Sequence, residues 1–184
     1  MSDRTALERL LTKRSVRQGD FVLASGKASS YYIDARLATM SAEGQVLVGR
    51  LGLAAIRHAG WQATAVGGLT MGADPVAYAI ARASSDDPPI LDAFSVRKTT
   101  KEHGTGRRIE GCFSTDAPVV VVEDVITTGA SALHAIEAIL AAGGTIAGVL
   151  AVVDREEGGA AMIEAGGYPV VALTTTARLG LPSK

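Results

Sequence analysis

The feature that most constrains the fold is a run of four valines followed at once by two acids and a turn rich in glycine and hydroxyl groups. β-Branched residues favour strands, and the unbroken run at residues 119–122 predicts a strand that is buried on both faces. Glu123 and Asp124 then lie at its carboxyl end, and residues 127–131 lead into a helix. In an open α/β sheet, ligands bind where the strands end, so this is the expected position of a site.

The residue types at this strand end predict a phosphorylated sugar as the ligand. A turn that opens a helix offers free N–H groups and the positive end of the helix dipole, which suits a phosphate group. Glu123 and Asp124 would repel phosphate, but they suit sugar hydroxyls or a metal ion carried by the substrate. The alternative is a buried strand before an ordinary helix whose N-cap is Thr128 or Ser131. A cap uses one hydroxyl group and leaves the two acids unexplained.

The composition indicates a soluble, cytoplasmic protein. The 184 residues fit a single domain that can bury a sizeable core. A net charge of −1 gives no sign of a general nucleic-acid or membrane surface. Cys112 is the only cysteine and cannot form an intramolecular disulfide, which fits a reducing compartment. No apolar run approaches the roughly 20 residues of a membrane helix, and the first residues are too charged for a signal peptide.

Strands and helices are expected to alternate along most of the chain, which predicts an α/β fold with a mostly parallel sheet covered by helices on both faces. The expected strands are 21–23, 30–33, 63–66, 90–96, 119–122, 145–153 and 170–173. The expected helices are 5–16, one capped by Ser41 and ending near Gly60, one with Pro75 in its first turn, one ending at 143–144, and a short one before the last strand. Residues 67–74 are expected to form a loop, and residues 84–89 a surface connector. The first helix and hairpin, about residues 1–35, fall outside the alternation and predict a small hood over an α/β core of about residues 36–184.

A basic segment precedes the valine strand. It contains five Lys or Arg residues between Arg97 and Glu110, against two acids, and its glycines and lack of apolar anchors predict a mobile loop. Mobile cations can close over a leaving group that gains negative charge, such as pyrophosphate. The alternative is an ordinary solvated basic loop.

The stretch 119–131 resembles the signature of the type I phosphoribosyltransferases, in which a hydrophobic strand is followed by Glu-Asp, two variable residues, Thr-Gly and a small residue. The resemblance implies that Glu123 and Asp124 contact the ribose hydroxyls of phosphoribosyl pyrophosphate (PRPP). It implies Mg²⁺ on the diphosphate as the cofactor, with Asp124 as a candidate ligand. The residues expected to wrap the ribose 5′-phosphate are Thr127, Thr128, Gly129, Ala130 and Ser131. Val125 and Ile126 are also expected to contact PRPP.

Further motifs resemble the orotate phosphoribosyltransferases within this family. The pattern Arg-Lys-x-x-Lys-x-His-Gly is similar to their catalytic loop, which implies that Arg97, Lys98, Lys101 and His103 contact pyrophosphate. In that family the loop reaches into the neighbouring subunit, so a homodimer with shared sites is implied. The loop 67–75 corresponds to the segment that binds pyrophosphate through backbone amides, with Thr70 and Gly72 as its expected contacts. Several relatives have Lys where this chain has Met71, and Arg36 is a further candidate for the same anionic pocket.

The remaining motifs imply the base. The pattern Phe-x-Leu-x-Ser-Gly at residues 21–26, followed by Tyr31 and Tyr32, resembles the orotate-binding hood of the same family. Many relatives have Lys where this chain has Ala24, and Lys27 is the candidate to supply that charge. Arg155 matches the family arginine that binds the orotate carboxylate, helped by Thr128, and bidentate pairing is what a guanidinium offers a carboxylate. The alternative for Arg155 is a surface pair with Asp154 or Glu156.

Together the motifs imply transfer of a phosphoribosyl group from PRPP to orotate, giving orotidine 5′-phosphate and pyrophosphate in pyrimidine biosynthesis. A phosphoribosyltransferase for another base stays open as an alternative. A regulator that senses PRPP without chemistry is a second alternative, although such proteins usually add a nucleic-acid-binding module or a basic face. A fused enzyme that also decarboxylates the product would need a second domain, for which 184 residues leave no room.

Overall fold

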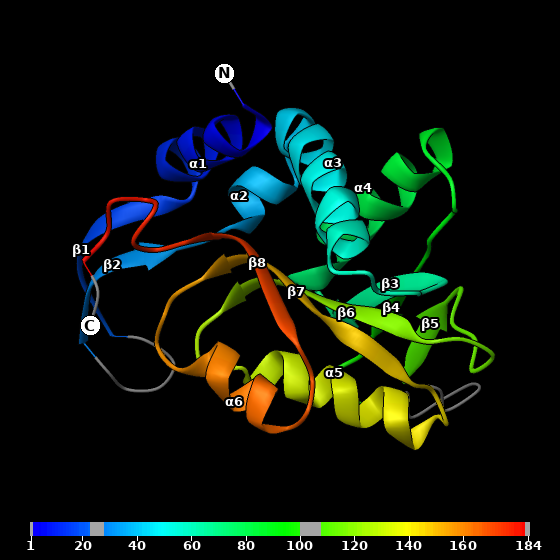
Figure 1. The fold of residues 1–184 in the computed structure, drawn as a ribbon. Helices are drawn as coiled ribbons and strands as arrows, with labels where there is room; N and C mark the ends of the chain where they lie inside the picture. Colours follow the sequence, from blue (N-terminus) through cyan, green and yellow to red (C-terminus); the bar gives the residue numbers. More distant parts are fainter. Residues whose placement is uncertain (1, 23–27, 100–107, 183–184) are drawn as a thin grey trace.

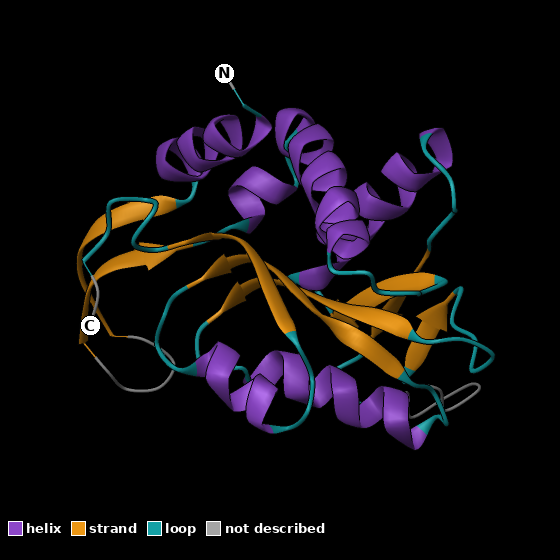
Figure 2. Ribbon diagram, viewed as in Figure 1, coloured by secondary structure: helices purple, strands orange, loops and turns teal. Residues whose placement is uncertain are grey.

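The computed structural model describes residues 2–22, 28–99 and 108–182. Its centre is a six-stranded sheet with the strand order β5-β4-β3-β6-β7-β8, in which β5 is antiparallel and the other strands are parallel. Figures 1 and 2 show this sheet running across the middle of the molecule. The mostly parallel sheet expected from the sequence is therefore confirmed. The strands are β3 (Ala65–Leu69), β4 (Asp92–Val96), β5 (Ile109–Gly111), β6 (Val119–Ile126), β7 (Ile146–Asp154) and β8 (Val170–Thr175).

Helices cover both faces of the sheet, as Figure 1 shows. On one face lie α1 (Asp3–Arg14), α2 (Arg36–Thr39), α3 (Ala42–His58) and α4 (Ala73–Asp86), and on the other lie α5 (Ala130–Ala141) and α6 (Gly159–Ala165). The valines of β6 explain why both faces need cover, because alternate side chains of a strand point to opposite faces. Val120 and Val122 pack with α1, α3 and α4, whereas Val119 and Val121 pack with α5.

The first residues form a helix and an antiparallel hairpin of β1 (Val16–Val22) and β2 (Ala28–Ile33). Figure 1 places this hairpin beyond the carboxyl ends of β6 and β7, where the site was expected. The leucines of α1 are buried in the same apolar cluster as Val120, so the segment is anchored to the sheet core.

The start of helix α3 has the N-cap that the sequence predicts. Ser41 is the N-cap of α3, as expected, and its hydroxyl oxygen accepts a hydrogen bond from the Gly44 backbone N–H at 3.1 Å.

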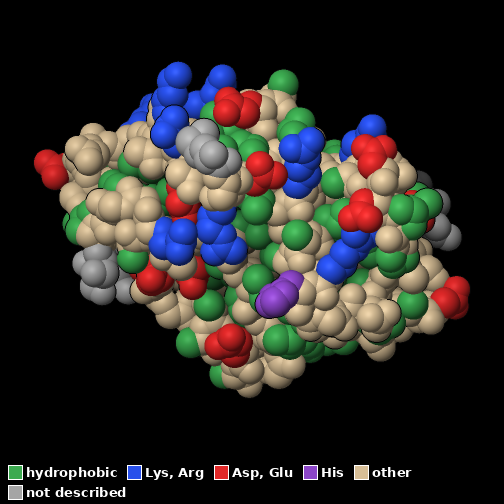
Figure 3. Space-filling view, turned by 45° about the horizontal axis from the view of Figure 1, so that its top comes forward, with side chains coloured by type: hydrophobic (Ala, Val, Ile, Leu, Met, Phe, Trp, Pro, Cys, Tyr) green, Lys and Arg blue, Asp and Glu red, His purple; other side chains and the backbone are tan. Residues whose placement is uncertain are grey.

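On the face that carries α1, α3 and α4, acidic and basic side chains are interspersed (Figure 3). None of the helices in the described ranges is both long and apolar enough to cross a membrane.

The structure corrects the expected loop at residues 67–74. Gly67 and Gly68 are not loop residues but lie inside β3, which continues to Leu69. A Cβ atom at Gly67 would lie 2.3 Å from the Phe94 carbonyl oxygen, and one at Gly68 would lie 2.1 Å from the Val122 carbonyl oxygen. The two glycines therefore allow close packing between neighbouring elements, a use of glycine that sequence alone does not separate from turn formation.

Several other elements also differ from expectation. Strand β6 continues past Val122 to Ile126, so Glu123 and Asp124 lie within the strand, near its carboxyl end. The first helix ends at Arg14, two residues early, because Val16 already pairs with Ile33 in the hairpin. Helix α4 continues through Ser84, which was expected in a surface connector; its buried hydroxyl oxygen accepts a hydrogen bond from the Leu91 backbone N–H at 2.9 Å. Strand β5 was not expected, because its three residues lie in a segment that was taken entirely for a loop.

Candidate functional site

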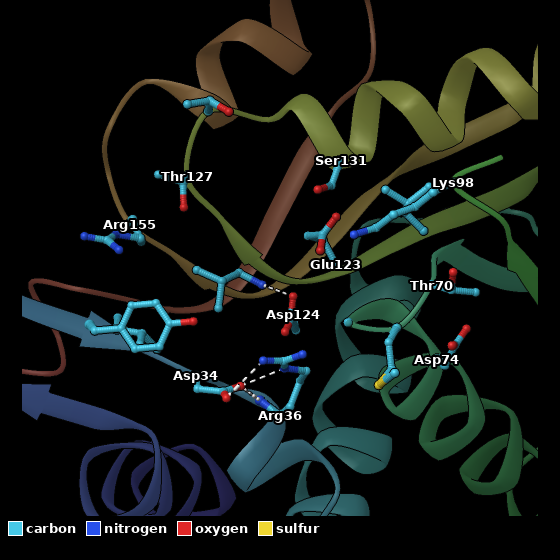
Figure 4. A pocket seen from close by; sticks show the side chains of 17 residues that line it. Asp34, Arg36, Thr70, Asp74, Lys98, Glu123, Asp124, Thr127, Ser131 and Arg155 are labelled. Atoms are coloured by element: carbon cyan, nitrogen blue, oxygen red, sulfur yellow. Dashed lines mark hydrogen bonds and ion pairs between the residues drawn. The ribbon is translucent and has the colours of Figure 1, made fainter. Parts of the chain in front are cut away.

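A cavity of about 870 Å³ opens at the carboxyl ends of β3, β6 and β7, facing the hairpin (Figure 4). This confirms the position expected from the valine strand. The described residues that line it are Tyr32, Ile33, Asp34, Arg36, Leu69, Thr70, Met71, Gly72, Asp74, Lys98, Glu123, Asp124, Val125, Thr127, Thr128, Ser131 and Arg155.

Strand β6 places its two acids in the cavity in different environments. Glu123 is buried, and burial together with the neighbouring Asp124 charge raises its pKa well above its usual range. Glu123 Oε2 is itself buried and has no hydrogen-bond partner among the described residues. Asp124 is less buried, and its Oδ1 accepts a hydrogen bond from the Val125 backbone N–H at 2.9 Å. A Cβ atom at Gly72 would lie 2.5 Å from Asp124 Oδ1, so glycine lets the β3–α4 turn approach the acid.

The turn after β6 forms the second part of the site. Helix α5 begins at Ala130, and its N-cap is Gly129 in the left-handed conformation with φ of 81°. The alternative in which Thr128 or Ser131 is the N-cap is therefore wrong. A smaller cavity of about 80 Å³ is lined by Glu123 and by residues 125–132. The hydroxyl groups of this turn and the positive end of the α5 dipole thus face a space that suits an anion.

Arg155 follows β7 and is buried against the hairpin. Its guanidinium carbon lies 4.8 Å from the centre of the Tyr31 ring, and Nη2 lies 2.8 Å from Glu157 Oε1. A longer contact of 3.5 Å joins Nη2 to the Ser29 hydroxyl. The alternative of a surface pair is wrong, because both the Arg155 and Glu157 side chains are buried, at 4% and 8% exposure. The arginine is held on one side and still lines the cavity.

The residue that follows Arg155 is tied elsewhere. Glu156 Oε2 accepts hydrogen bonds from the Thr176 hydroxyl at 2.9 Å and from the Ala177 backbone N–H at 2.8 Å. These hydrogen bonds lower the pKa of Glu156. Glu156 therefore connects the β7–α6 turn to the end of β8, and it is not the partner of the arginine.

The two tyrosines expected over the base have different positions. Alternate residues of β2 point to opposite sides, so Tyr31 is buried beneath Arg155 while Tyr32 is 40% exposed and lines the cavity. Tyr32 also packs on Phe21, with ring centres 5.8 Å apart. The hairpin thus offers one aromatic ring to the cavity and uses the other to support a cation.

In the described part of the basic segment, one cation lines the cavity and its neighbour does not. Lys98 lines the cavity, and Figure 4 shows its amino group directed toward Glu123. Arg97 is not among the lining residues; its Nε lies 3.2 Å from Glu110 Oε1. Lys101 and His103, and likewise Ala24 and Lys27 of the hairpin, lie outside the described residues.

The loop after β3 lines the cavity through Thr70, Met71 and Gly72, as expected. No role was expected for Asp34 or Asp74, yet both line the cavity. Asp74 lies in the first turn of α4, and its Oδ1 accepts a hydrogen bond from the Ser95 hydroxyl at 2.7 Å. Its place after a glycine turn and before Pro75 was a usable signal, because it marks a helix start at the sheet edge.

This arrangement defines a type I phosphoribosyltransferase: a mostly parallel sheet, an acid pair and an anion-binding turn at its carboxyl edge, and a hairpin above them. Comparison with curated proteins identifies the particular group. The chain is 46% identical over 176 residues to an orotate phosphoribosyltransferase of Aquifex aeolicus, covering 94% of this chain and 95% of that protein. It is 45% identical over 181 residues to the orotate phosphoribosyltransferase of Mycobacterium tuberculosis, covering 97% of both. The chain therefore belongs to the orotate phosphoribosyltransferase family. A search of protein-family models found no match.

Solved structures agree. The Mycobacterium tuberculosis enzyme in complex with PRPP superposes with a TM-score of 0.83 at 41% identity, covering 98% of this chain and 100% of that one. A phosphoribosyltransferase from Corynebacterium diphtheriae gives a TM-score of 0.86 at 40% identity over the same shares. An adenine phosphoribosyltransferase from Leishmania donovani, at 16% identity and a TM-score of 0.66, shares the fold only.

Proposed function

We propose that this protein transfers the phosphoribosyl group of PRPP to orotate, giving orotidine 5′-phosphate and pyrophosphate, a step of pyrimidine biosynthesis. The observation that carries the proposal is that one cavity joins an acid pair and an anion-binding turn to a buried arginine supported by an aromatic ring. The acid pair and the turn suit a phosphorylated ribose, and the arginine with its aromatic support suits a planar anionic base. Family membership supports the same reaction.

The ribose phosphate is assigned to β6 and the turn after it. Glu123 and Asp124 would bind the ribose hydroxyls, and residues 125–131 would enclose the 5′-phosphate. Because Glu123 is buried beside another acid, it can carry a proton and donate a hydrogen bond where two carboxylates could only accept.

The diphosphate is assigned to the other end of the cavity. Thr70 and Gly72 would bind it, and Arg97, Lys98, Lys101 and His103 would stabilise it as it departs. Mg²⁺ fits the donor set, because this ion is commonly bound by one or two carboxylates together with substrate phosphates, and Asp124 offers such a carboxylate. The ion would reach the site with the substrate diphosphate, and Asp124 would be its candidate protein ligand. When bound, it would neutralise charge on the leaving diphosphate.

The base is assigned to the hairpin side. Arg155 would bind the orotate carboxylate with Thr128, and Tyr32 would cover the pyrimidine ring. Tyr31 acts from beneath the guanidinium, and Lys27 is the remaining candidate from the hairpin. In the transfer, the bond from the anomeric carbon to the diphosphate oxygen breaks and a bond to the pyrimidine nitrogen forms, through an oxocarbenium-like state. The nitrogen gives up its proton to the departing diphosphate or to water. Fixing both partners in one cavity supplies much of the acceleration.

A homodimer with the basic loop shared between subunits is part of this proposal, on the resemblance of the loop motif. Mixed dimers of K101A with D124N test it. If the loop acts in the neighbouring subunit, mixing restores one complete site per dimer, and activity rises well above that of either parent. Mixing that restores nothing would contradict the sharing.

The reaction is tested by following the ultraviolet absorbance of orotate with PRPP and Mg²⁺, against the same mixture with a chelator. We expect loss of orotate that requires the metal and releases one pyrophosphate per orotate. Orotate left unchanged would overturn the assignment, and a panel of other bases would then identify the substrate. R155Q provides the check on the base, because it should raise the KM for orotate by about 10-fold or more while leaving the KM for PRPP nearly unchanged.

A further inference from the structure

We propose that Arg36, held by Asp34, is a fixed cation that binds the diphosphate end of PRPP, and that Asp34 is its positioning residue. The inference rests on the proposed function, because it takes PRPP as the ligand. It develops the sequence-based expectation that Arg36 is a candidate for the anionic pocket, and it adds Asp34, for which no role was expected.

Arg36 is the first residue of α2 and is fixed by the carboxylate two residues before it. Its Nε donates to Asp34 Oδ1 at 2.8 Å, its Nη2 to Asp34 Oδ2 at 3.1 Å, and its backbone N–H to Asp34 Oδ1 at 3.2 Å. Such a two-pronged contact sets the plane of the guanidinium as well as its position. No described residue hydrogen bonds to Nη1, which leaves donor groups free for a ligand. The adjacent guanidinium lowers the pKa of Asp34, so this carboxylate stays charged near neutral pH.

The position of Arg36 matches the diphosphate end. Arg36 lines the main cavity and also an adjoining depression of about 390 Å³, and Met71 lines both as well. Figure 4 shows Arg36 beside Asp34 and below Asp124, and its charge interacts with that of Asp124. With the ribose on Asp124 and the diphosphate on Thr70 and Gly72, the bond that breaks would lie close to this guanidinium.

The charges of the cavity also favour this role. Its described lining contains four acids and three cations, so a multiply charged diphosphate needs each cation that can reach it. Arg155 is engaged by Glu157, on the hairpin side, and Lys98 points toward Glu123. Met71 brings no charge to the loop after β3. Arg36 is the cation of this lining that is both fixed and next to that loop.

A purely structural role explains the pair less well. The Arg36 and Asp34 side chains are 42% and 24% exposed, and ion pairs this accessible contribute little to stability. Losing them should therefore affect ligand binding far more than folding.

The test compares R36Q, R36K and D34N with wild type for the KM of PRPP, the KM of orotate and kcat, with thermal unfolding as a check on folding. We expect R36Q to raise the KM for PRPP about 10- to 100-fold, the factor that loss of one hydrogen bond between charged groups brings. The KM for orotate should change less than about twofold. A change this small would show that orotate has lost no hydrogen bond to a charged group. R36K should recover only part of the loss, because lysine cannot form the two-pronged contact. D34N should shift the KM for PRPP in the same direction by a smaller factor.

The matched control is R82Q, which breaks the exposed Arg82–Asp86 pair on α4, away from the main cavity. It should leave both KM values unchanged. An R36Q enzyme with the wild-type KM for PRPP and wild-type kcat would overturn the role of Arg36 and leave the proposed reaction standing. If wild type does not consume orotate, calorimetric titration with PRPP still tests the role of Arg36. Tight PRPP binding by wild type that is lost in R36Q supports the role. Equal PRPP binding by the two proteins refutes it.

Discussion

At the scale of single residues, the pair of Arg155 and Glu157 shows how a charged side chain can be buried inside a protein when it has a charged partner. Taking two charges out of water is expensive, and their attraction together with the contact to Tyr31 offsets that cost. The pair therefore need not add to stability, whereas loss of either member leaves a buried charge without a partner. What it provides is an arginine already oriented at the cavity.

Replacing Arg155 with Met should lower the free energy of unfolding by about 3 kcal/mol, because Glu157 would be left buried and unpaired. The double variant R155M/E157M should recover most of that loss. Urea denaturation followed by circular dichroism measures both. A double variant as unstable as R155M would show that the unpaired carboxylate is not the cause.

Glu123 is a second residue whose environment sets its chemistry. Burial and the Asp124 charge raise its pKa, so the folded protein holds a proton that the unfolded chain releases near pH 4.5. The stability linked to this proton is fully present below pH 4.5 and is lost as the pH rises through the raised pKa. Above pH 4.5, therefore, unfolding releases this proton, and a rising pH favours the unfolded chain.

Replacing Glu123 with Gln removes this dependence. The melting temperature of E123Q should rise relative to wild type as the pH increases from 4 to 8, and PRPP binding should weaken. Thermal unfolding across this range measures the difference, and E164Q, on the exposed surface of α6, should show none. A constant difference between E123Q and wild type at every pH would contradict the raised pKa.

At the scale of elements, the packing of strand β3 against its neighbours requires glycine at two positions. Gly67 faces the Phe94 ring and carbonyl group, and Gly68 faces the Val122 carbonyl group and the start of α4 at Ala73. This close contact brings the turn after β3 beside the end of β6. The proposed diphosphate and ribose ends of the cavity are adjacent for that reason.

An alanine at Gly68 should therefore destabilise the protein by about 3 kcal/mol, since its Cβ atom would displace backbone. The control is Gly60→Ala, where nothing lies within 4 Å but φ is +72°, and the expected loss is about 1 kcal/mol. Chemical denaturation of both variants measures the difference. Equal losses would mean that the neighbouring backbone can move aside for a Cβ atom, and that close packing does not require glycine at position 68.

At the scale of the whole molecule, the two ends of the chain are fixed to each other across the same core. Arg178 Nε lies 2.6 Å from Glu8 Oε1, and the Thr174 hydroxyl donates to the same oxygen at 3.1 Å. Leu179 and Leu181 are buried in the apolar cluster that also contains Leu7. These polar and apolar contacts fix α1 to the end of the chain, and α1 leads directly into the hairpin that faces the cavity.

Truncating Leu181 to Ala should cost about 2 kcal/mol, at the low end for a buried leucine because it lies near the chain end. Unfolding should remain a single transition. Trp61, the only tryptophan in the sequence, packs on β7 at Gly148 and reports on the sheet, while circular dichroism reports on the helices. Separate transitions for the two signals would show that the chain ends unfold independently of the sheet.

The sequence alone determined the parts of this protein that depend on local pattern. The four valines required a strand covered on both faces, and alternation of strands and helices required a mostly parallel sheet. Once that topology was set, Glu123, Asp124 and the turn after them had to lie at the ligand-binding edge. The resemblance to the orotate phosphoribosyltransferases also indicated Arg155 and the loop after β3, and both directly follow strands of the same sheet.

Tertiary structure decided what depends on neighbours far along the chain. Only packing showed that Gly67 and Gly68 belong to a strand, that Tyr31 supports Arg155 while Tyr32 faces the cavity, and that Glu157 is the partner of the arginine. It likewise placed Asp34 and Arg36 in the cavity, although they precede β6 by more than 80 residues. Pattern fixes which face a side chain points to, but burial, pairing and pKa are set by the groups that folding brings against it.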